Sequence, residues 1–230
     1  GVGPDGKELL SSSDVAEMAE PQIESPIPDE DQGLAWTVRR WDGHKVLGQD
    51  ADTFGQRCYV RLVPDRRFAC CLFTNSPTGA RLARELLPRL MGELLEIDVP
   101  APAVQGEVGA IQDPSAFVGS YDRLHQRIDV YPGADGGLGL SVSPSGMLSQ
   151  LGRVGFKAPL TPVNLNWGEA ERPSGPAVAD DDVPFREIAH KVFRTTMPDT
   201  GLHEPVVFTV LGDGSPGLYL NGRLHRRPVV

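Results

Sequence analysis

The feature that most limits the fold of this chain is a change of pattern at residues 99–113. That stretch, VPAPAVQGEVGAIQD, is rich in Pro, Ala and Gly and separates a segment of mixed pattern from one that contains strands only. Such a composition is typical of a linker. We therefore expect two parts, residues 1–98 and residues 114–230, joined by a linker at 99–113.

The first part predicts two helices among short strands. SSSDVAEMAEP is typical of a helix that a Ser caps and Pro21 ends. A longer helix is predicted over 77–95, with Ser76 as N-cap and Pro77 at the first helical position. Its leucines recur at helical spacing, so we expect it to cover a sheet and to bend at Pro88.

The strand candidates of the first part are GLAWTVRRW, HKVLGQDA, RCYVRLV and RFACCLFT, and the turn PDRR joins the last two. Pairing around that turn places Cys58 roughly opposite Phe73. The neighbours Cys70 and Cys71 then point to opposite faces of the sheet. A disulfide framework or a cysteine metal site is therefore not expected.

The second part predicts a closed antiparallel barrel. About eight short strands recur with Gly, Pro and Asp turns between them: AFVGSYDR, QRIDVYP, GLGLSVS, a segment near FKAPLTPV, REIAHKVFRT, PVVFTVL, GLYLNG and LHRRPVV. A barrel of this size encloses space for one small ligand. The polar insertion at 168–184 is predicted to be a loop beside the barrel mouth.

Several stretches together resemble one protein family. LLSSSDVAEM is similar to an LLSPxSVxxM helix, GLAWTV to a GLGW strand, and GQDADTFGQRCYVRLVPD to GHDGxTxGQxxxLRVVPD. These patterns resemble the C-terminal portion of serine β-lactamases and penicillin-binding-protein-like esterases of the class C-related branch. FVGSYDR, RIDV and LNGRLHRR resemble the lipocalin-like barrel appended to many of them. The resemblance implies an α+β fold: a truncated β-lactamase-like antiparallel sheet with a C-terminal helix, then a lipocalin-like barrel of about eight strands.

The catalytic groups that the resemblance implies are missing. Such enzymes use Ser and Lys in S-x-x-K, a Tyr in Y-x-N and a strand motif, because a serine hydroxyl is a weak nucleophile without a base. No lysine of the chain has a Ser three residues before it. The only Y-x-N, Tyr219-Leu220-Asn221, falls in the last barrel hairpin, where we interpret it as a chance match.

The strand motif is also altered. Gln49 stands where the family pattern has His, and Ala51 where it has the following Gly, while Asp50 remains. Gln cannot accept a proton as a base, and the methyl of Ala51 narrows the groove beside the strand. We therefore expect no serine hydrolase activity from this chain alone. Whether it is an enzyme of another kind, such as a cyclase or isomerase, stays open.

The truncation leaves strand 68–74 without the N-terminal strand that pairs with it in the family. An apolar edge strand is an aggregation hazard unless it is covered. The cover could be a second copy of the chain, a partner protein that supplies the missing half, or the chain's own barrel. The first two alternatives predict an oligomer.

We expect a degenerate β-lactamase-like protein that binds, and in one version cyclises or isomerises, a hydrophobic small molecule in natural-product biosynthesis. No catalytic residue is assigned. The candidate ligand-binding residues are Gln49, Asp50, Tyr121, Tyr131, Trp167, His190 and Tyr219. The alternatives are a subunit of a split serine hydrolase with its nucleophile on another chain, a non-catalytic interaction module, or a fragment of a longer enzyme.

Charge and composition exclude some partners. The net charge of −9 argues against nucleic acid and anionic membranes. No apolar run reaches the ~18–20 residues of a membrane span, and the N-terminus lacks the order of a signal peptide, so a cytoplasmic protein is expected. The five histidines are scattered without ligand spacing, so no metal or cofactor is expected.

Overall fold

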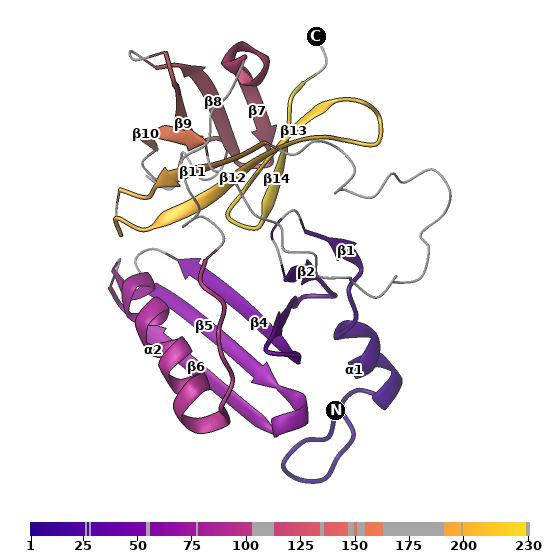
Figure 1. Cartoon of the computed structure of the whole chain (residues 1–230). Helices are drawn as coiled ribbons and strands as arrows, with labels where there is room; N and C mark the ends of the chain where they lie inside the picture. Colours follow the sequence, from indigo (N-terminus) through magenta and orange to yellow (C-terminus); the bar gives the residue numbers. More distant parts are fainter. Residues whose placement is uncertain are drawn as a thin grey trace. The chain divides into compact units, whose positions relative to one another are not determined.

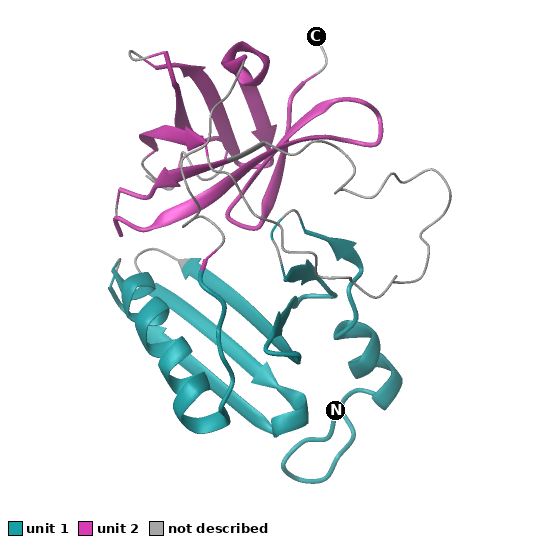
Figure 2. Cartoon of the chain, viewed as in Figure 1, with its two compact units in different colours: residues 1–101 teal, residues 102–230 magenta. Residues whose placement is uncertain are grey.

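The chain forms two compact units, residues 1–101 and 102–230, and each is described by itself (Figure 2). The computed structural model describes residues 1–25, 27, 29–53, 56–76, 78–102, 113–133, 136–146, 150, 155–162, 191–198 and 200–228. The predicted ligand residues Trp167 and His190, the insertion at 168–184 and most of the linker at 99–113 lie outside these residues.

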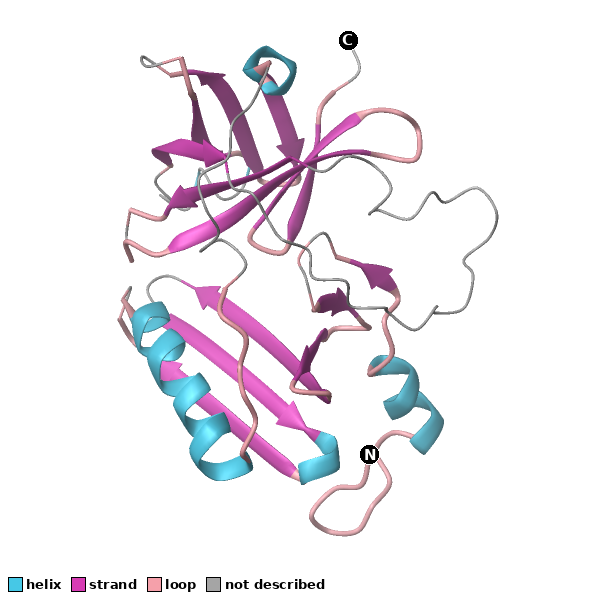
Figure 3. Cartoon of the chain, in the orientation of Figure 1, coloured by secondary structure: helices cyan, strands magenta, loops and turns pink. Residues whose placement is uncertain are grey.

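The first unit is built on one antiparallel sheet of six strands in chain order (Figures 1 and 3). Its strands are β1 (Ile23–Glu24), β2 (Glu30–Gln32), β3 (Thr37–Trp41), β4 (His44–Thr53), β5 (Gln56–Val63) and β6 (Phe68–Thr74). The predicted first helix is confirmed as α1 (Ser12–Met18), where Ser11 and Asp14 form a reciprocal capping box. The 3-10 turn η1 (Pro64–Arg66) joins β5 to β6.

One face of this sheet is covered by α2 (Gly79–Leu95) and the segment that follows it (Figure 1). Buried Met91 and Ile97 pack with Trp41, Val46 and Val63 of the sheet. The helix continues through Pro88. The predicted helix on a sheet is therefore confirmed, and its apolar stripe is what holds the two layers together.

The predicted start of this helix is wrong by two residues. The N-cap is Thr78, not Ser76, and it makes no side-chain capping bond. The hydroxyl of Ser76 instead accepts the N–H of Thr78 in the preceding turn. The helix begins where Gly79 rests on Thr74, so close that any Cβ at residue 79 would clash with that side chain.

The second unit is a closed antiparallel barrel of eight strands, as the sequence predicts. Around the ring the order is β10-β11-β12-β13-β14-β7-β8-β9. The strands are β7 (Gly119–Arg123), β8 (Gln126–Pro132), β9 (Leu138–Pro144), β10 (Phe156–Pro162), β11 (Lys191–Thr196), β12 (His203–Val210), β13 (Pro216–Leu220) and β14 (Arg223–Arg226). The short 3-10 helix η3 (Pro114–Phe117) precedes β7.

The described interior of the barrel is a packed apolar core. Phe193 and Phe208 lie 5.1 Å apart between ring centroids, and Phe117 lies within 5.4 Å of both. Tyr121, only 1% exposed, stacks its edge against Phe208 at 5.7 Å. Edge-to-face pairs of this kind add to the stability gained from burial alone. The aromatic residues that could have lined a ligand chamber therefore pack against one another here.

Candidate functional site

The sheet of the first unit has a second face, opposite α2, on which apolar side chains are exposed. Because side chains alternate along a strand, the residues paired across β4, β5 and β6 form rows on this face. We call it the open face and define it by two such rows, Gln49–Val60–Cys71 and Ala51–Cys58–Phe73. Phe73 is 72% exposed, which is unusual for a phenylalanine in a strand.

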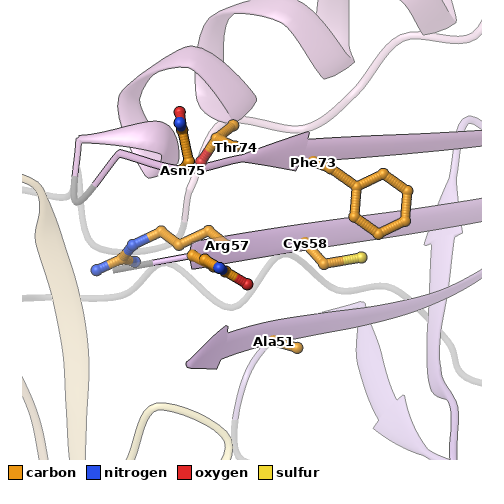
Figure 4. Close-up of a pocket in the computed structure, with 7 residues that line it drawn as sticks. Ala51, Arg57, Cys58, Phe73, Thr74 and Asn75 are labelled. Atoms are coloured by element: carbon orange, nitrogen blue, oxygen red, sulfur yellow. The ribbon is translucent and has the colours of Figure 1, made fainter. Parts of the chain in front are cut away.

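A hollow of about 480 Å³ lies at one end of the open face, lined by Ala51, Gln56, Arg57, Cys58, Phe73, Thr74 and Asn75. Figure 4 shows Ala51, Cys58 and Phe73 side by side on three adjacent strands. The polar side chains stand at the strand ends. The volume falls within the range of about 300–1,000 Å³ found for small-molecule sites. An apolar floor with a polar rim is suited to a small ligand that carries one polar end.

The altered strand motif divides between the two faces of the sheet. Gln49 and Ala51 lie on the open face, where Gln49 is exposed and Ala51 lines the hollow. Gly48 and Asp50, which match the family pattern, lie on the face that α2 covers. The two positions that depart from the pattern thus share the open face, whereas Gly48 and Asp50 belong to the opposite face.

Asp50, a predicted ligand residue, binds Arg61 instead. Arg61 Nη1 donates to Asp50 Oδ1 at 2.5 Å, and Arg61 Nη2 donates to Oδ2 at 3.1 Å. The Arg61 side chain is 7% exposed, so this bidentate ion pair compensates the buried charge of the guanidinium. Sequence reasoning missed Arg61, although its place two residues from Val63 on the helix-facing side of β5 was a usable signal.

Gly48 is the residue that lets this charged cluster assemble. A Cβ at residue 48 would lie 2.6 Å from Arg39 Nη1 and 2.9 Å from Arg61 Nη1. Arg39 also donates to Glu30 at 3.0 Å, and the Arg61 guanidinium lies 5.9 Å from the ring of Trp41. The cluster holds β2, β3, β4 and β5 together and is structural.

The thiol in the hollow is a poor nucleophile. Burial raises the pKa of Cys58, and the nearby Cys71 and Asp50 raise it further. A raised pKa keeps the sulfur protonated, whereas catalytic cysteines have a lowered one. The described lining also holds no histidine or carboxylate that could serve as a base. The site is therefore arranged for binding without covalent chemistry at Cys58.

The barrel candidates do not converge on one site. Tyr121 points into the core and donates to the Phe117 carbonyl at 3.0 Å. Alternation with the core residues Ile128 and Leu218 directs Tyr131 and Tyr219 away from the barrel core, and Tyr219 is nevertheless buried. The ring of Tyr131 lies over Gly139.

The Y-x-N sequence has a structural explanation. Asn221 and Gly222 both have positive φ, 52° and 71°, and form the two-residue turn between β13 and β14. Asn-Gly is the favoured sequence for such a hairpin. Asn221 therefore meets the demands of a turn, and Tyr219 is a residue of the strand before it.

The described residues contain neither a membrane-spanning helix nor a metal-binding cluster. None of the helices in this part of the chain has the length and hydrophobicity to cross a bilayer. Nor do three or more His, Cys, Asp or Glu side chains in it gather where they could hold a metal ion. All three cysteines are free thiols.

Comparisons with known proteins support a relationship to penicillin-binding proteins. No protein-family model matches the sequence. Penicillin-binding protein 4 of Amycolatopsis lactamdurans is 28% identical over 128 residues, which are 54% of this chain and 33% of that protein. The chain therefore spans about a third of the length of this relative.

Two crystal structures of SurE resemble nearly the whole chain. The structure with D-Leu covers 95% of this chain with a TM-score of 0.54 at 20% identity, and the other covers 95% with a TM-score of 0.55 at 22% identity. The chain covers 44% and 43% of those structures. At this identity the likeness shows the fold alone. Together the comparisons support a penicillin-binding-protein-like, β-lactamase-like relationship. The eight-stranded barrel is seen in the second unit.

Proposed function

We propose that this chain is a non-hydrolytic member of the β-lactamase-like group that binds a hydrophobic small molecule in the hollow of its open face. The observation that carries the proposal is the position of Ala51. It departs from the family pattern, lines the hollow and lies beside Cys58 and Phe73. Gln49, on the same face, replaces the His of the pattern with a side chain that donates and accepts hydrogen bonds but moves no proton.

The class of ligand follows from the lining. Ala51, Cys58 and Phe73 offer apolar surface, while Gln56 and Asn75 offer amide groups at the rim. A small aliphatic amino acid with a blocked amine has both parts. SurE has been crystallised with D-Leu, which makes N-acetyl-D-leucine a suitable first probe. Any cyclisation or isomerisation would then come from holding one conformer of the ligand, since the described lining of the hollow holds no histidine or carboxylate.

A matched pair of variants tests the proposal. Titration of N-acetyl-D-leucine, followed by NMR or calorimetry, is expected to saturate with the unaltered chain and to weaken at least tenfold in Ala51→Leu, which fills the hollow. Ala16→Leu makes the same change at an exposed position of α1 and is expected to bind normally. Equal binding by both variants, or no binding by the unaltered chain, would refute the proposal.

The second candidate function is a subunit of a split serine hydrolase. It is favoured by the similarity to Penicillin-binding protein 4 together with the absence of S-x-x-K from the given sequence. A fluorescent penicillin separates the two functions. We expect no covalent label on this chain. A labelled second polypeptide in a stable complex purified from the native source would establish the split hydrolase instead.

A further inference from the structure

The inner face of the barrel carries two positive charges at one of its mouths. Arg123 ends β7 and Arg223 begins β14, and both residues are exposed. Alternation with the core residue Tyr121 places Arg123 on the inner face. His225 is 0% exposed and pairs with a core residue of β13, so Arg223, two residues before it, is also on the inner face. The eight strands close on one another, so both positions follow from the pairing of the barrel itself.

The strand register brings these two arginines together. Arg226 pairs with Asp122 between β14 and β7. The next position of this antiparallel register sets His225 opposite Arg123. Because Arg223 lies two residues along β14 from His225, it is the diagonal neighbour of Arg123. Diagonal neighbours on one face of a sheet are about 7–8 Å apart, a distance at which two long side chains can contact the same ligand.

His225 and Gln126 form a fixed polar surface beside the two arginines. Gln126 pairs with Arg123 across the turn between β7 and β8. His225 Nε2 lies 2.9 Å from Gln126 Oε1, and His225 Nδ1 lies 3.2 Å from the carbonyl oxygen of Arg223. The contact between His225 and Gln126 joins β14 to β8 on either side of β7. The strand ends that carry the two arginines are therefore held in place.

The two arginines also lack the carboxylate that a neighbouring arginine has. Arg127, on the outer face of β8, pairs with Asp129 at 2.9 Å. Within the described part of the chain, no carboxylate forms an ion pair with Arg123 or Arg223. Burial and the charge of Arg223 lower the pKa of Arg123, since two like charges are held close together. In a chain of net charge −9 this mouth is a local excess of positive charge.

We propose that Arg123 and Arg223 together bind one oxyanion, the carboxylate or phosphate group of a small molecule, at this mouth of the barrel. A planar guanidinium can donate two parallel hydrogen bonds to such a group, and one anion between the arginines offsets both charges. The described interior of the barrel is a packed core, so the charged group binds at the mouth and the rest of the ligand lies outside the barrel. This site is separate from the hollow of the first unit and does not rest on the proposed function.

Titration with inorganic phosphate and, separately, with acetate tests the site. Backbone NMR signals of the full-length chain are followed at neutral pH and constant ionic strength, which keeps general salt effects equal. The signals of Arg123 and Arg223 are expected to shift and to saturate. Saturation with phosphate alone identifies a phosphate ligand, and saturation with acetate alone identifies a carboxylate. If neither anion saturates the signals, as when an acidic group of the chain itself fills the mouth, the proposal is overturned.

Three variants that remove the same charge separate the site from unspecific attraction. Arg123→Gln and Arg223→Gln are each expected to weaken binding at least fivefold, whereas Arg127→Gln, on the outer face, is expected to bind as the unaltered chain does. Equal weakening by all three would overturn the proposal. Far-UV circular dichroism confirms folding, and Arg223→Lys, which keeps the charge, is expected to weaken phosphate binding less than Arg223→Gln. Ala51→Leu is expected to leave this titration unchanged, so the barrel site and the proposed function fail or succeed independently.

Discussion

The two units solve the problem of exposed strand edges in opposite ways. The barrel closes β10 onto β9 through the whole ring and directs its phenylalanines inward. The sheet of the first unit ends at β6, and α2 covers one of its faces, where Ala83 and Leu87 pack with Tyr59. Phe193 in the barrel is 0% exposed, whereas Phe73 in the sheet is 72% exposed. The same residue type is therefore buried core in one unit and exposed surface in the other.

The largest expected effect separates these two phenylalanines. Phe193→Ala removes a ring that packs against Phe117 and Phe208, and is expected to lower the free energy of unfolding of the barrel by about 3–5 kcal/mol. Phe73→Ala is expected to change stability by less than about 0.5 kcal/mol. Differential scanning calorimetry of both variants measures the contrast. A large loss in Phe73→Ala would mean that the open face is covered in solution.

The next effect compares the two faces of β4. Asp50→Ala leaves Arg61 buried without its carboxylate, and Arg61 Nε already lacks a hydrogen-bond partner among the described residues. Because Asp50 is itself 41% exposed, we expect a loss of about 2 kcal/mol rather than the full cost of breaking a buried pair. Gln49→Ala, one residue away on the open face, is expected to cost less than about 0.5 kcal/mol. Urea unfolding of both variants provides the measurement, and equal losses would contradict the assignment of the faces.

Much of the fold could be predicted because its signals are local. The alternation in QRCYVRLV and FACCLFT, with the turn between them, correctly predicts that Cys58 pairs with Phe73. The eight strands of the barrel follow from turn residues such as Asn221-Gly222. The start of α2 could not be predicted, because it depends on the contact between Gly79 and Thr74, which are neighbours only once the strand and helix are folded.

The candidate site was harder to predict because a sequence does not show which face of a strand is covered. Gln49 and Asp50 are both predicted ligand-binding residues, yet alternation places them on opposite faces of the sheet. Asp50 is bound to Arg61, whereas Gln49 is not part of this ion pair. Tyr121, Tyr131 and Tyr219 likewise depend on the register of the barrel, which decides between core and outer surface. Phe73 is exposed because α2 packs on the other face of the sheet. The local sequence around Phe73 does not show which face the helix covers.

A smaller loss of stability is expected at acidic pH, and it affects the barrel alone. His225 is 0% exposed, with Nε2 2.9 Å from Gln126 Oε1, and burial lowers its pKa below the ordinary 6.5. Arg123 and Arg223 lower it further. The unfolded chain then binds a proton more readily than the folded one, so stability is complete above about pH 6.5 and falls as the pH drops towards the lowered pKa.

Thermal unfolding between pH 8 and pH 4.5 checks this dependence. His225→Gln is expected to flatten the acid limb of the barrel transition, since Gln does not titrate and can still bond to Gln126. The unaltered chain, followed in parallel, is the control. If the barrel loses the same stability in acid with and without His225, another group is responsible.

The smallest expected effect is chemical and compares the two faces of the sheet through their thiols. Burial raises the pKa of Cys58 in the hollow and of Cys70 beneath α2. Because only the thiolate reacts, both are expected to be alkylated by iodoacetamide severalfold more slowly than a free thiol at pH 8, and faster as the pH rises. Mass spectrometry of the peptides separates the two rates. A ligand in the hollow should slow Cys58 further and leave Cys70 unchanged. If it slowed both equally, its effect would be a general tightening of the sheet, and the hollow would not be the binding site.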